Sequence, residues 1–276
     1  MRNLRGKVAV VTGAGSGIGR ALAVGLSREG TDLALCDIDG TGLEETGSII
    51  LKENFRGRLE VYQVNVARRE AVEEFAHEVI RDFGGVDIVI NNAGVSSSGG
   101  VEELTYETLH WTIDINLWGV IHVTKAFLPC LRRSPEASIV NLSSVYGLLG
   151  VPGQAAYCAS KFGVRGFTEA LRQELYQSNI TVTLVFPGGV KTRIARNSRT
   201  DYHLDPETYE AGLRRIEATF KTTAAEAAQV IIQGIQKKTP RILIGKDAGK
   251  IDLLARTRPG SYDRVIAKYL RRVESH

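Results

Sequence analysis

A glycine-rich turn between a buried strand and a helix constrains this chain more than any other feature of its sequence. The strand is the run Lys7–Thr12, whose continuous apolar core is typical of a strand covered on both faces in a parallel sheet. Gly13-Ala14-Gly15-Ser16-Gly17-Ile18-Gly19 follows, and a helical pattern then runs from Arg20 to Gly30. Free N–H groups and the helix dipole favour an anion such as a pyrophosphate at this helix start. A tight turn without a ligand would explain the glycines equally well, so the rest of the chain must decide.

Strands and helices alternate along most of the chain, which predicts βαβ units in an open sheet. Further strands are expected at 32–37, 59–64, 86–91, 137–143, 180–186 and 241–244, and helices at about 42–54, 68–83, 105–131, 155–178 and 223–237. The predicted fold class is α/β, a Rossmann-type doubly wound, mostly parallel seven-stranded sheet with helices on both faces. Because no repeat or linker is found, residues 1–276 are expected to form a single dinucleotide-binding catalytic domain. A mobile lid without a clear strand is expected at about 190–222, and a C-terminal extension at about 246–276.

Charge and composition remove several classes of function. The 35 basic and 31 acidic side chains leave a net charge of +4, so neither a nucleic-acid partner nor a membrane surface is required. Since no apolar span reaches 18 residues, we expect a cytoplasmic protein. Cys36, Cys130 and Cys158 are far apart and the histidines lack ligand spacing, so neither a disulfide framework nor a metal site is expected.

Tyr157 and Lys161 stand four residues apart in a predicted helix, which places them on one face, one turn apart. An ammonium beside a phenol stabilises the phenolate and lowers a pKa that is ordinarily about 10, as an acid/base catalyst requires. The same spacing is also common on solvated helix faces.

Asp37 ends the second predicted strand, 18 residues after Gly19. A carboxylate at that place can accept hydrogen bonds from the adenosine ribose and repel a 2′-phosphate, which favours NAD(H) over NADP(H). Alternatively, Asp37 caps a helix and Asp39 is the relevant carboxylate. Arg20 and Arg28 are cations that could help to hold a phosphate.

Several motifs stand in the order in which one enzyme family carries them, between about residues 5 and 245. They are Thr12-Gly13 with Gly17 and Gly19, Asn91-Asn92-Ala93-Gly94, Asn116, Ser144, Tyr157 with Lys161, and Pro187-Gly188. The chain thereby resembles the classical short-chain dehydrogenases/reductases. It departs from them at Asn65, where the family usually has an aspartate near the adenine. An asparagine can still hydrogen-bond, so we expect altered adenine contacts without loss of binding.

The resemblance implies a role for each motif. Tyr157 would exchange a proton with the substrate oxygen, while Lys161 would lower the tyrosine pKa and hold the nicotinamide ribose. Ser144 would bind the substrate oxygen, with Ser143 as its rival, and Asn116 would hold a water that relays protons unless it only kinks its helix. The implied cofactor-binding residues are Gly13, Ser16, Gly17, Ile18, Gly19, Asp37, Asn65, Val66, Asn92, Ala93, Gly94, Tyr157, Lys161, Pro187, Gly188, Val190 and Thr192.

The leading hypothesis is an oxidoreductase that moves a hydride between NAD(H) and a secondary alcohol or ketone on a hydrophobic body. The alternatives are an NADPH-dependent ketoacyl-type reductase and a non-catalytic dinucleotide-binding regulator. Residues expected to face the substrate are Ser96, Val145, Tyr146, Leu148, Leu149, Val151, Gly188 and the lid from Lys191 onward. The lid cations Lys191, Arg193, Arg196 and Arg199 form either a solvated face or a site for an acidic group such as a coenzyme A phosphate.

The tail after Gly245 is expected to form an amphipathic helix over the substrate pocket or a neighbouring subunit. Its apolar residues are Ile251, Leu253, Leu254, Tyr262, Val265, Ile266, Tyr269 and Leu270. By the family resemblance we expect a homodimer or a homotetramer.

Overall fold

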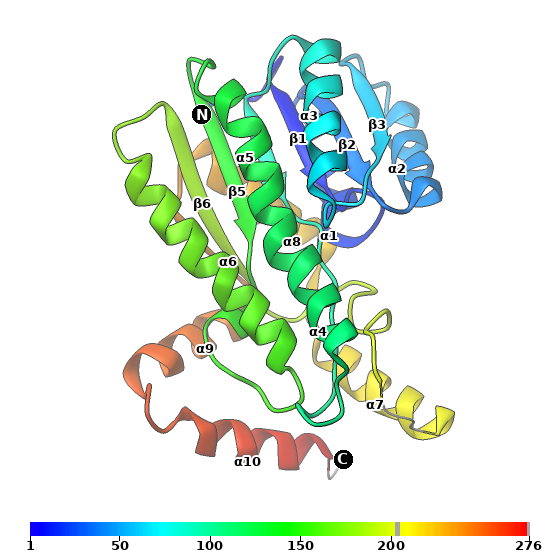
Figure 1. The fold of residues 1–276 in the computed structure, drawn as a ribbon, viewed down its shortest axis with the longest axis vertical. Coiled ribbons are helices and arrows are strands. Elements are labelled where there is room, and N and C mark those ends of the chain that lie inside the picture. Colours follow the sequence, from blue (N-terminus) through cyan, green and yellow to red (C-terminus); the bar gives the residue numbers. More distant parts are fainter. Residues whose placement is uncertain (202–204, 275–276) are drawn as a thin grey trace.

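The computed structural model describes residues 1–201 and 205–274, and a seven-stranded sheet forms its centre (Figure 1). In spatial order the strands are β3 (Leu59–Gln63), β2 (Asp32–Asp37), β1 (Val8–Thr12), β4 (Ile88–Asn91), β5 (Ala137–Leu142), β6 (Ile180–Pro187) and β9 (Arg241–Ile244). Every neighbouring pair is parallel. The predicted doubly wound α/β fold is confirmed, and the strand order reverses between β1 and β4.

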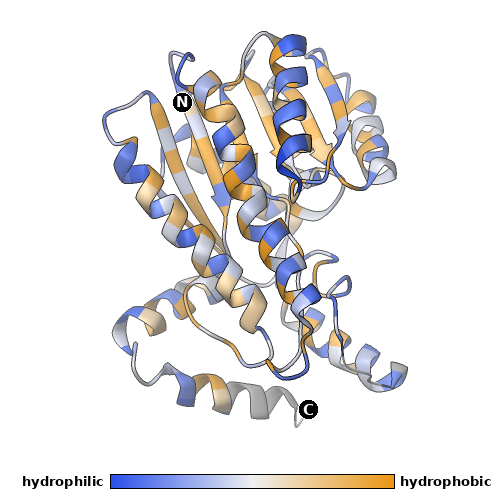
Figure 2. Cartoon of the chain, viewed as in Figure 1, coloured by the Kyte–Doolittle hydropathy of each residue, from blue (hydrophilic) through white to orange (hydrophobic). Residues whose placement is uncertain are grey.

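Helices cover both faces of this sheet. One face carries α1 (Gly17–Arg28), α2 (Gly40–Lys52) and α8 (Ala224–Gln236), and the other carries α3 (Arg69–Phe83), α5 (Gly119–Leu131) and α6 (Ala155–Glu174). Ala9 and Val11 of β1 pack with the first set of helices, and Val10 packs with the second. Figure 2 shows apolar strands between helices whose outer sides are hydrophilic. Burial on both faces explains why the strands are apolar without alternation.

The single helix expected at 105–131 is interrupted. In its place stand α4 (Tyr106–Ile113), the π-helical turn η1 (Asp114–Trp118) and α5. Asn116 lies in the π turn and is fully buried. Its Oδ1 accepts from the Val95 N–H at 2.8 Å, and its Nδ2 donates to the Val95 carbonyl at 2.9 Å. The widened turn therefore brings this amide onto the loop that follows β4.

The lid contains strands that the sequence did not predict. β7 (Val190–Lys191) pairs in parallel with β8 (Thr222–Thr223), so the beginning and the end of the lid are joined. Between them, Arg196 forms ion pairs with Glu210 and Glu217 of α7 (Pro206–Thr219), at 3.3 and 2.9 Å. Residues 202–204 of the predicted lid lie outside the described residues.

Asp201 fastens the middle of the lid to the start of α4. Its carboxylate accepts hydrogen bonds from the N–H and hydroxyl groups of Thr105 at 2.8 and 2.9 Å, and from the Thr108 hydroxyl at 2.9 Å. Beside it, Arg199 forms an ion pair with Glu107 at 3.0 Å. Both Arg196 and Arg199 thus already have carboxylate partners.

The C-terminal extension forms two helices, where one was expected. They are α9 (Lys246–Thr257) and α10 (Tyr262–Glu274). Pro259-Gly260 between them explains the break, because proline lacks an N–H donor and glycine disfavours a helix. Ile251 and Ala255 of α9 pack on a small apolar cluster that contains Leu148. The side chains of Tyr269 and Leu270, and residues 275–276, lie outside the described part of the chain.

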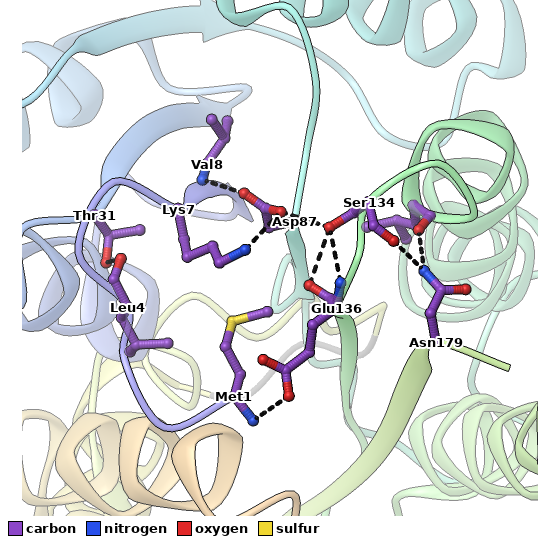
Figure 3. A network of polar contacts seen from close by, with 10 residues as sticks. Met1, Leu4, Lys7, Val8, Thr31, Asp87, Ser134, Glu136 and Asn179 are labelled. Carbon is purple, nitrogen blue, oxygen red and sulfur yellow. Dashed lines mark hydrogen bonds and ion pairs between the residues drawn. The ribbon is translucent and has the colours of Figure 1, made fainter.

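At the amino-terminal edge of the sheet, Asp87 gathers polar groups from three segments (Figure 3). Its carboxylate accepts from the Lys7 ammonium at 3.2 Å, the Val8 N–H at 3.0 Å and the Ser134 hydroxyl at 2.6 Å. Asn179 donates to the Ser134 carbonyl at 2.6 Å and so adds the start of β6. These bonds fix the ends of β1, β4 and β5 relative to one another.

Across the described residues, no helix is both long and apolar enough to cross a membrane. Cys36, Cys130 and Cys158 are buried thiols.

Candidate active site

Most of the residues predicted for the site meet in one cavity of about 300 Å³ at the carboxyl ends of the strands. The predicted residues that line it are Gly13, Ser16, Gly17, Ile18, Asp37, Asn65, Val66, Asn92, Ala93, Gly94, Ser144, Tyr157, Lys161, Pro187, Gly188, Val190 and Thr192. Gly19 and Asn116 stand outside this lining. The residues that the family resemblance implies for the cofactor and the chemistry therefore largely share one cavity.

Two residues of the glycine turn approach neighbouring backbone so closely that no side chain would fit. A Cβ on Gly13 would lie 2.8 Å from the Cα of Ala93, and a Cβ on Gly19 would overlap the Gly13 carbonyl. Gly19 therefore serves the packing of α1 against the turn, which explains why it does not face the cavity. Ser16, the N-cap of α1, makes no side-chain capping bond, so the first N–H groups of the helix remain available to an anion.

Asn92 joins the end of β4 to this turn. Its Nδ2 donates to the carbonyls of Thr12 at 2.9 Å and Gly13 at 3.1 Å, while the Thr12 hydroxyl accepts from the N–H groups of Asn92 and Ala93 at 3.0 Å. The two walls of the cavity are thereby held in a fixed relation.

Asp37 lies at the end of β2, on the outer part of the cavity. Its two oxygens accept from the N–H groups of Gly15 at 2.9 Å and Asp39 at 3.1 Å. Asp39, the alternative carboxylate, instead caps α2 through the Gly42 N–H. The helix-cap role weighed for Asp37 thus belongs to Asp39.

The two arginines considered for a phosphate have carboxylate partners. Arg20 forms an ion pair with Glu45 at 2.8 Å and also donates to the Gly15 carbonyl, and Arg28 forms an ion pair with Glu53 at 2.6 Å. Any phosphate at these cations would have to compete with a carboxylate.

Tyr157 and Lys161 project from the first turns of α6 and are 9% and 4% exposed. The Lys161 Nζ donates to the Leu142 carbonyl at 3.1 Å and lies 5.7 Å from the centre of the Tyr157 ring. Burial lowers the pKa of Lys161 to about 8. The lysine thus interacts with both β5 and the phenol.

The expected lowering of the tyrosine pKa is not found. Burial raises the pKa of Tyr157, and a hydrogen bond with the Ser144 side chain only partly opposes this. The reason is that the phenol is removed from water while the ammonium bonds the Leu142 carbonyl at 3.1 Å. Tyr157 is therefore held as a neutral phenol at neutral pH.

Ser144 and Ser143 have different tasks. The Ser143 hydroxyl donates to the Lys161 carbonyl at 2.8 Å and fastens α6 to the end of β5. Ser144 accepts from the Tyr146 N–H at 3.2 Å and is the serine that hydrogen-bonds Tyr157. Ser144 therefore stays the predicted partner of the substrate oxygen, since the Ser143 hydroxyl is engaged with α6.

Asn116 lies behind the cavity wall. Besides its two bonds to Val95, its Nδ2 donates to the Ser160 hydroxyl at 3.0 Å, and that hydroxyl donates to the Tyr157 carbonyl at 2.7 Å. A Cβ on Gly94 would lie 3.1 Å from the Asn116 Oδ1 and 3.3 Å from the Lys161 Nζ, so the amide and the ammonium both border this glycine. Asn116 therefore ties η1, α6 and the loop after β4 together.

Some of the expected substrate-facing residues lie elsewhere. Ser96 and Gly188 line the cavity, but Val145, Tyr146, Leu148, Leu149 and Val151 do not. Leu148 is buried with Val164 and Phe186, and the Tyr146 ring stands edge-on to Tyr157 at 5.9 Å. The apolar run 145–151 is therefore explained in part by the core.

Other lining residues were not predicted. They are Ile38, Val64, Val95, Ile115 and Leu142. Arg193, Ile194, Asn197 and Phe220 also line the cavity, and they belong to the lid from Lys191 onward that was expected to face the substrate. Ile38, Val64 and Val95 directly adjoin predicted residues, so their place in the chain was a usable signal. The pairing of β7 with β8 brings Phe220, near the end of the lid, to the cavity. Within the described residues, no three His, Cys, Asp or Glu side chains are placed to hold a metal ion.

Comparisons with known proteins agree with this arrangement. The family model of the short chain dehydrogenases matches residues 7–203. The Mycobacterium tuberculosis protein SadH is 44% identical over 269 residues, which cover 97% of this chain and 96% of SadH. A short-chain dehydrogenase/reductase from Burkholderia phymatum, solved in complex with NAD, is 29% identical with a TM-score of 0.86 and covers 95% of this chain and 96% of that one. An alcohol dehydrogenase from Thermococcus sibiricus, solved with 5-hydroxy-NADP, is 29% identical with a TM-score of 0.73 and covers 87% and 94%. The parallel sheet, the motifs and these matches place the chain in the short-chain dehydrogenase/reductase family of oxidoreductases.

Proposed function

We propose that this chain transfers a hydride between NAD(H) and a secondary alcohol or ketone that carries a hydrophobic body. The observation that carries the proposal is the buried group of Ser144, Tyr157 and Lys161 in the same cavity as the glycine turn and Asp37. A binding protein has no chemical need for a phenol that bonds a serine beside a buried ammonium.

The residues present fit a nicotinamide dinucleotide, which supplies the hydride donor or acceptor when it is bound. The uncapped start of α1 offers N–H groups to a pyrophosphate. Asp37 would accept from the ribose hydroxyls and repel a 2′-phosphate, which supports NAD(H). Asn65 and Val66 would lie at the adenine, and Pro187, Gly188, Val190 and Thr192 at the nicotinamide end.

In the direction of reduction, Tyr157 donates its hydroxyl proton to the substrate oxygen. Its raised pKa keeps that proton in place at neutral pH until the oxygen gains charge. Ser144 donates a hydrogen bond to the same oxygen and stabilises the developing negative charge. The Lys161 ammonium then favours the phenolate that is left. In the direction of oxidation the same groups act in reverse.

The substrate class follows from the walls of the cavity. Val95, Ile115, Ile194 and Phe220 are apolar lining residues, and Ile194 and Phe220 come from the lid region. They would exclude water from the reacting oxygen and contact a hydrophobic body.

Oxidation of a panel of secondary alcohols with NAD and with NADP tests the proposal. We expect Tyr157→Phe to lower turnover by about 10²- to 10⁴-fold, because general acid/base catalysis contributes that much. Dinucleotide binding by Tyr157→Phe should persist, and Tyr106→Phe, at a tyrosine that is 81% exposed, is the matched control. Full activity of Tyr157→Phe would contradict the mechanism.

The same panel separates the alternatives. Dinucleotide binding by the wild type without turnover of any substrate would indicate a regulator, and a preference for NADPH with acyl thioesters would indicate a ketoacyl-type reductase. Asp37→Ala should raise the activity with NADP relative to NAD. An unchanged ratio would mean that the assignment of NAD is wrong.

A further inference from the structure

The C-terminal extension contacts backbone turns on two sides of the catalytic cavity. α9 begins directly after β9, at the carboxyl edge of the sheet, and α10 lies near the loop that leads into α6 (Figure 1). Both contacts are made to backbone N–H groups, so they act on the shape of each turn.

Asp247, in the first turn of α9, reaches the turn after β6. Its Oδ2 accepts a hydrogen bond from the Gly189 N–H at 2.7 Å. The Gly189 carbonyl accepts a hydrogen bond from the Thr222 N–H of β8 at 3.4 Å. Gly189 is therefore held from both sides, by the extension through its N–H and by the end of the lid through its carbonyl.

Two glycines make room for this carboxylate. A Cβ on Gly188 or on Gly245 would overlap the Asp247 carboxylate, and Gly245 also has a φ of +92° that few other residues adopt. A close fit around an acidic side chain indicates that the contact is built into the fold. Since Gly188 and Val190 line the cavity on either side of Gly189, fixing Gly189 fixes the wall intended for the nicotinamide end.

Tyr262, at the start of α10, holds the other turn. Its hydroxyl oxygen accepts from the Gly150 N–H at 3.2 Å. Gly150 belongs to the segment between Ser144 and Tyr157, and the neighbouring Leu148 packs with Ile251 and Ala255 of α9. The extension thus supports the loop between the two proposed catalytic side chains.

We propose that Asp247 and Tyr262 are positioning residues, the first for the cofactor side of the site and the second for the substrate side. The proposal rests on the proposed function for its consequences, because it assigns the turn held by Asp247 to dinucleotide binding. The extension is then part of the site, although neither side chain lines the cavity.

Direct binding of NADH, followed by its fluorescence, tests the role of Asp247. We expect Asp247→Ala to weaken binding by about five- to tenfold, since a hydrogen bond to a charged group is lost. Asp247→Asn keeps an acceptor oxygen and should restore binding to within about twofold of the wild type. Asp263→Ala, a loss of the same charge in α10, is the matched control and should bind NADH as the wild type does. Equal affinity of the wild type and Asp247→Ala would overturn the inference.

Tyr262→Phe should leave the affinity for NADH unchanged and raise the substrate KM by about threefold, with Tyr176→Phe at an exposed site as control. An unchanged KM would overturn the role of Tyr262.

Hydrogen–deuterium exchange separates this inference from the proposed function. Asp247→Ala should speed exchange at residues 187–192, and Tyr262→Phe at residues 148–152, in the protein without added ligand. If the wild type binds no dinucleotide, the proposed function fails while the exchange result still decides whether the two residues hold their turns. Unchanged exchange in both variants would contradict the positioning roles.

Discussion

Lys161 carries a buried charge that makes the stability of the protein depend on pH. Burial lowers its pKa to about 8, from an ordinary value of about 10.4. Below pH 8 both the folded and the unfolded chain hold the Lys161 proton, so Lys161 does not change the free energy of unfolding with pH in that range. Between pH 8 and about 10 the unfolded chain binds more protons, so the free energy of unfolding rises with pH, by at most about 1.4 kcal/mol per unit. Tyr157, whose pKa is raised, acts in the opposite direction only above about pH 10.

Chemical denaturation of the wild type and Lys161→Met between pH 7 and 9.5 measures this effect. We expect Lys161→Met to lack the rise in unfolding free energy above pH 8 that the wild type has. Lys250→Met, at an exposed lysine, should keep that rise. Parallel pH profiles of the wild type and Lys161→Met would contradict a lysine that titrates near pH 8.

The two neighbouring serines should separate catalysis from stability. Ser144→Ala is expected to lower kcat by about 10²-fold, because the proposed donor to the substrate oxygen is lost. Ser143→Ala removes the bond to the Lys161 carbonyl and should lower the free energy of unfolding by about 1 kcal/mol. Steady-state kinetics and denaturation of both variants give the comparison. A larger loss of kcat in Ser143→Ala than in Ser144→Ala would reverse the assignment.

At the site, residues could be predicted from the sequence where their chemistry and their order in the chain identify them. Asp37, Tyr157 and Lys161 line the same cavity. Each could be recognised from its place at the end of a predicted strand or on one face of a predicted helix. The pKa of Tyr157 could not be predicted, since its direction depends on burial and on which oxygen the Lys161 ammonium bonds. Which serine meets the phenol depends on one residue of register, which apolar patterning does not determine.

Among the elements, the π turn η1 carries Asn116, whose buried amide lies behind the wall of the cavity. Asn116→Ala would leave the N–H and carbonyl of Val95 without their side-chain partner, and we expect a loss of about 2–3 kcal/mol of unfolding free energy. Turnover should fall as well, because Asn116 also fixes Ser160 beside Tyr157. Denaturation and kinetics of Asn116→Ala, with Asn3→Ala at the exposed N-terminal segment as control, check this expectation. Unchanged stability of Asn116→Ala would contradict it.

Long elements followed from apolar periodicity, and short ones did not. Except for the edge strand β3, the strands of the main sheet and the helices that cover it each have two or more buried residues. β7 and β8 contain two residues each, which is too few for a pattern to be recognised. The sequence of η1 continues the helical pattern on both sides, so the π turn could not be recognised from the pattern. In the structure, the turn carries Asn116, which bonds Val95.

In the whole molecule, the charged network around Asp87 and the cavity lie at opposite edges of one sheet. Asp87→Asn weakens the charged network at the amino-terminal edge and should lower the free energy of unfolding by about 1–2 kcal/mol. KM and kcat at a temperature where the variant stays folded should match those of the wild type, because the cavity lies at the carboxyl edge. Thermal unfolding and kinetics on the same sample provide the measurement. A changed KM in folded Asp87→Asn would show that the two edges are coupled.

The pairing of β7 with β8 closes the lid at its base, where residue 190 meets residue 222. A loop whose ends are already joined can change in length at a small entropic cost, about 0.6 kcal/mol for each doubling. Residues between the two strands can therefore be lengthened, shortened or exchanged while the sheet and the proposed acid/base group keep their geometry. The closed base makes the lid a replaceable unit, through which relatives with the same reaction can diverge in the molecules they accept.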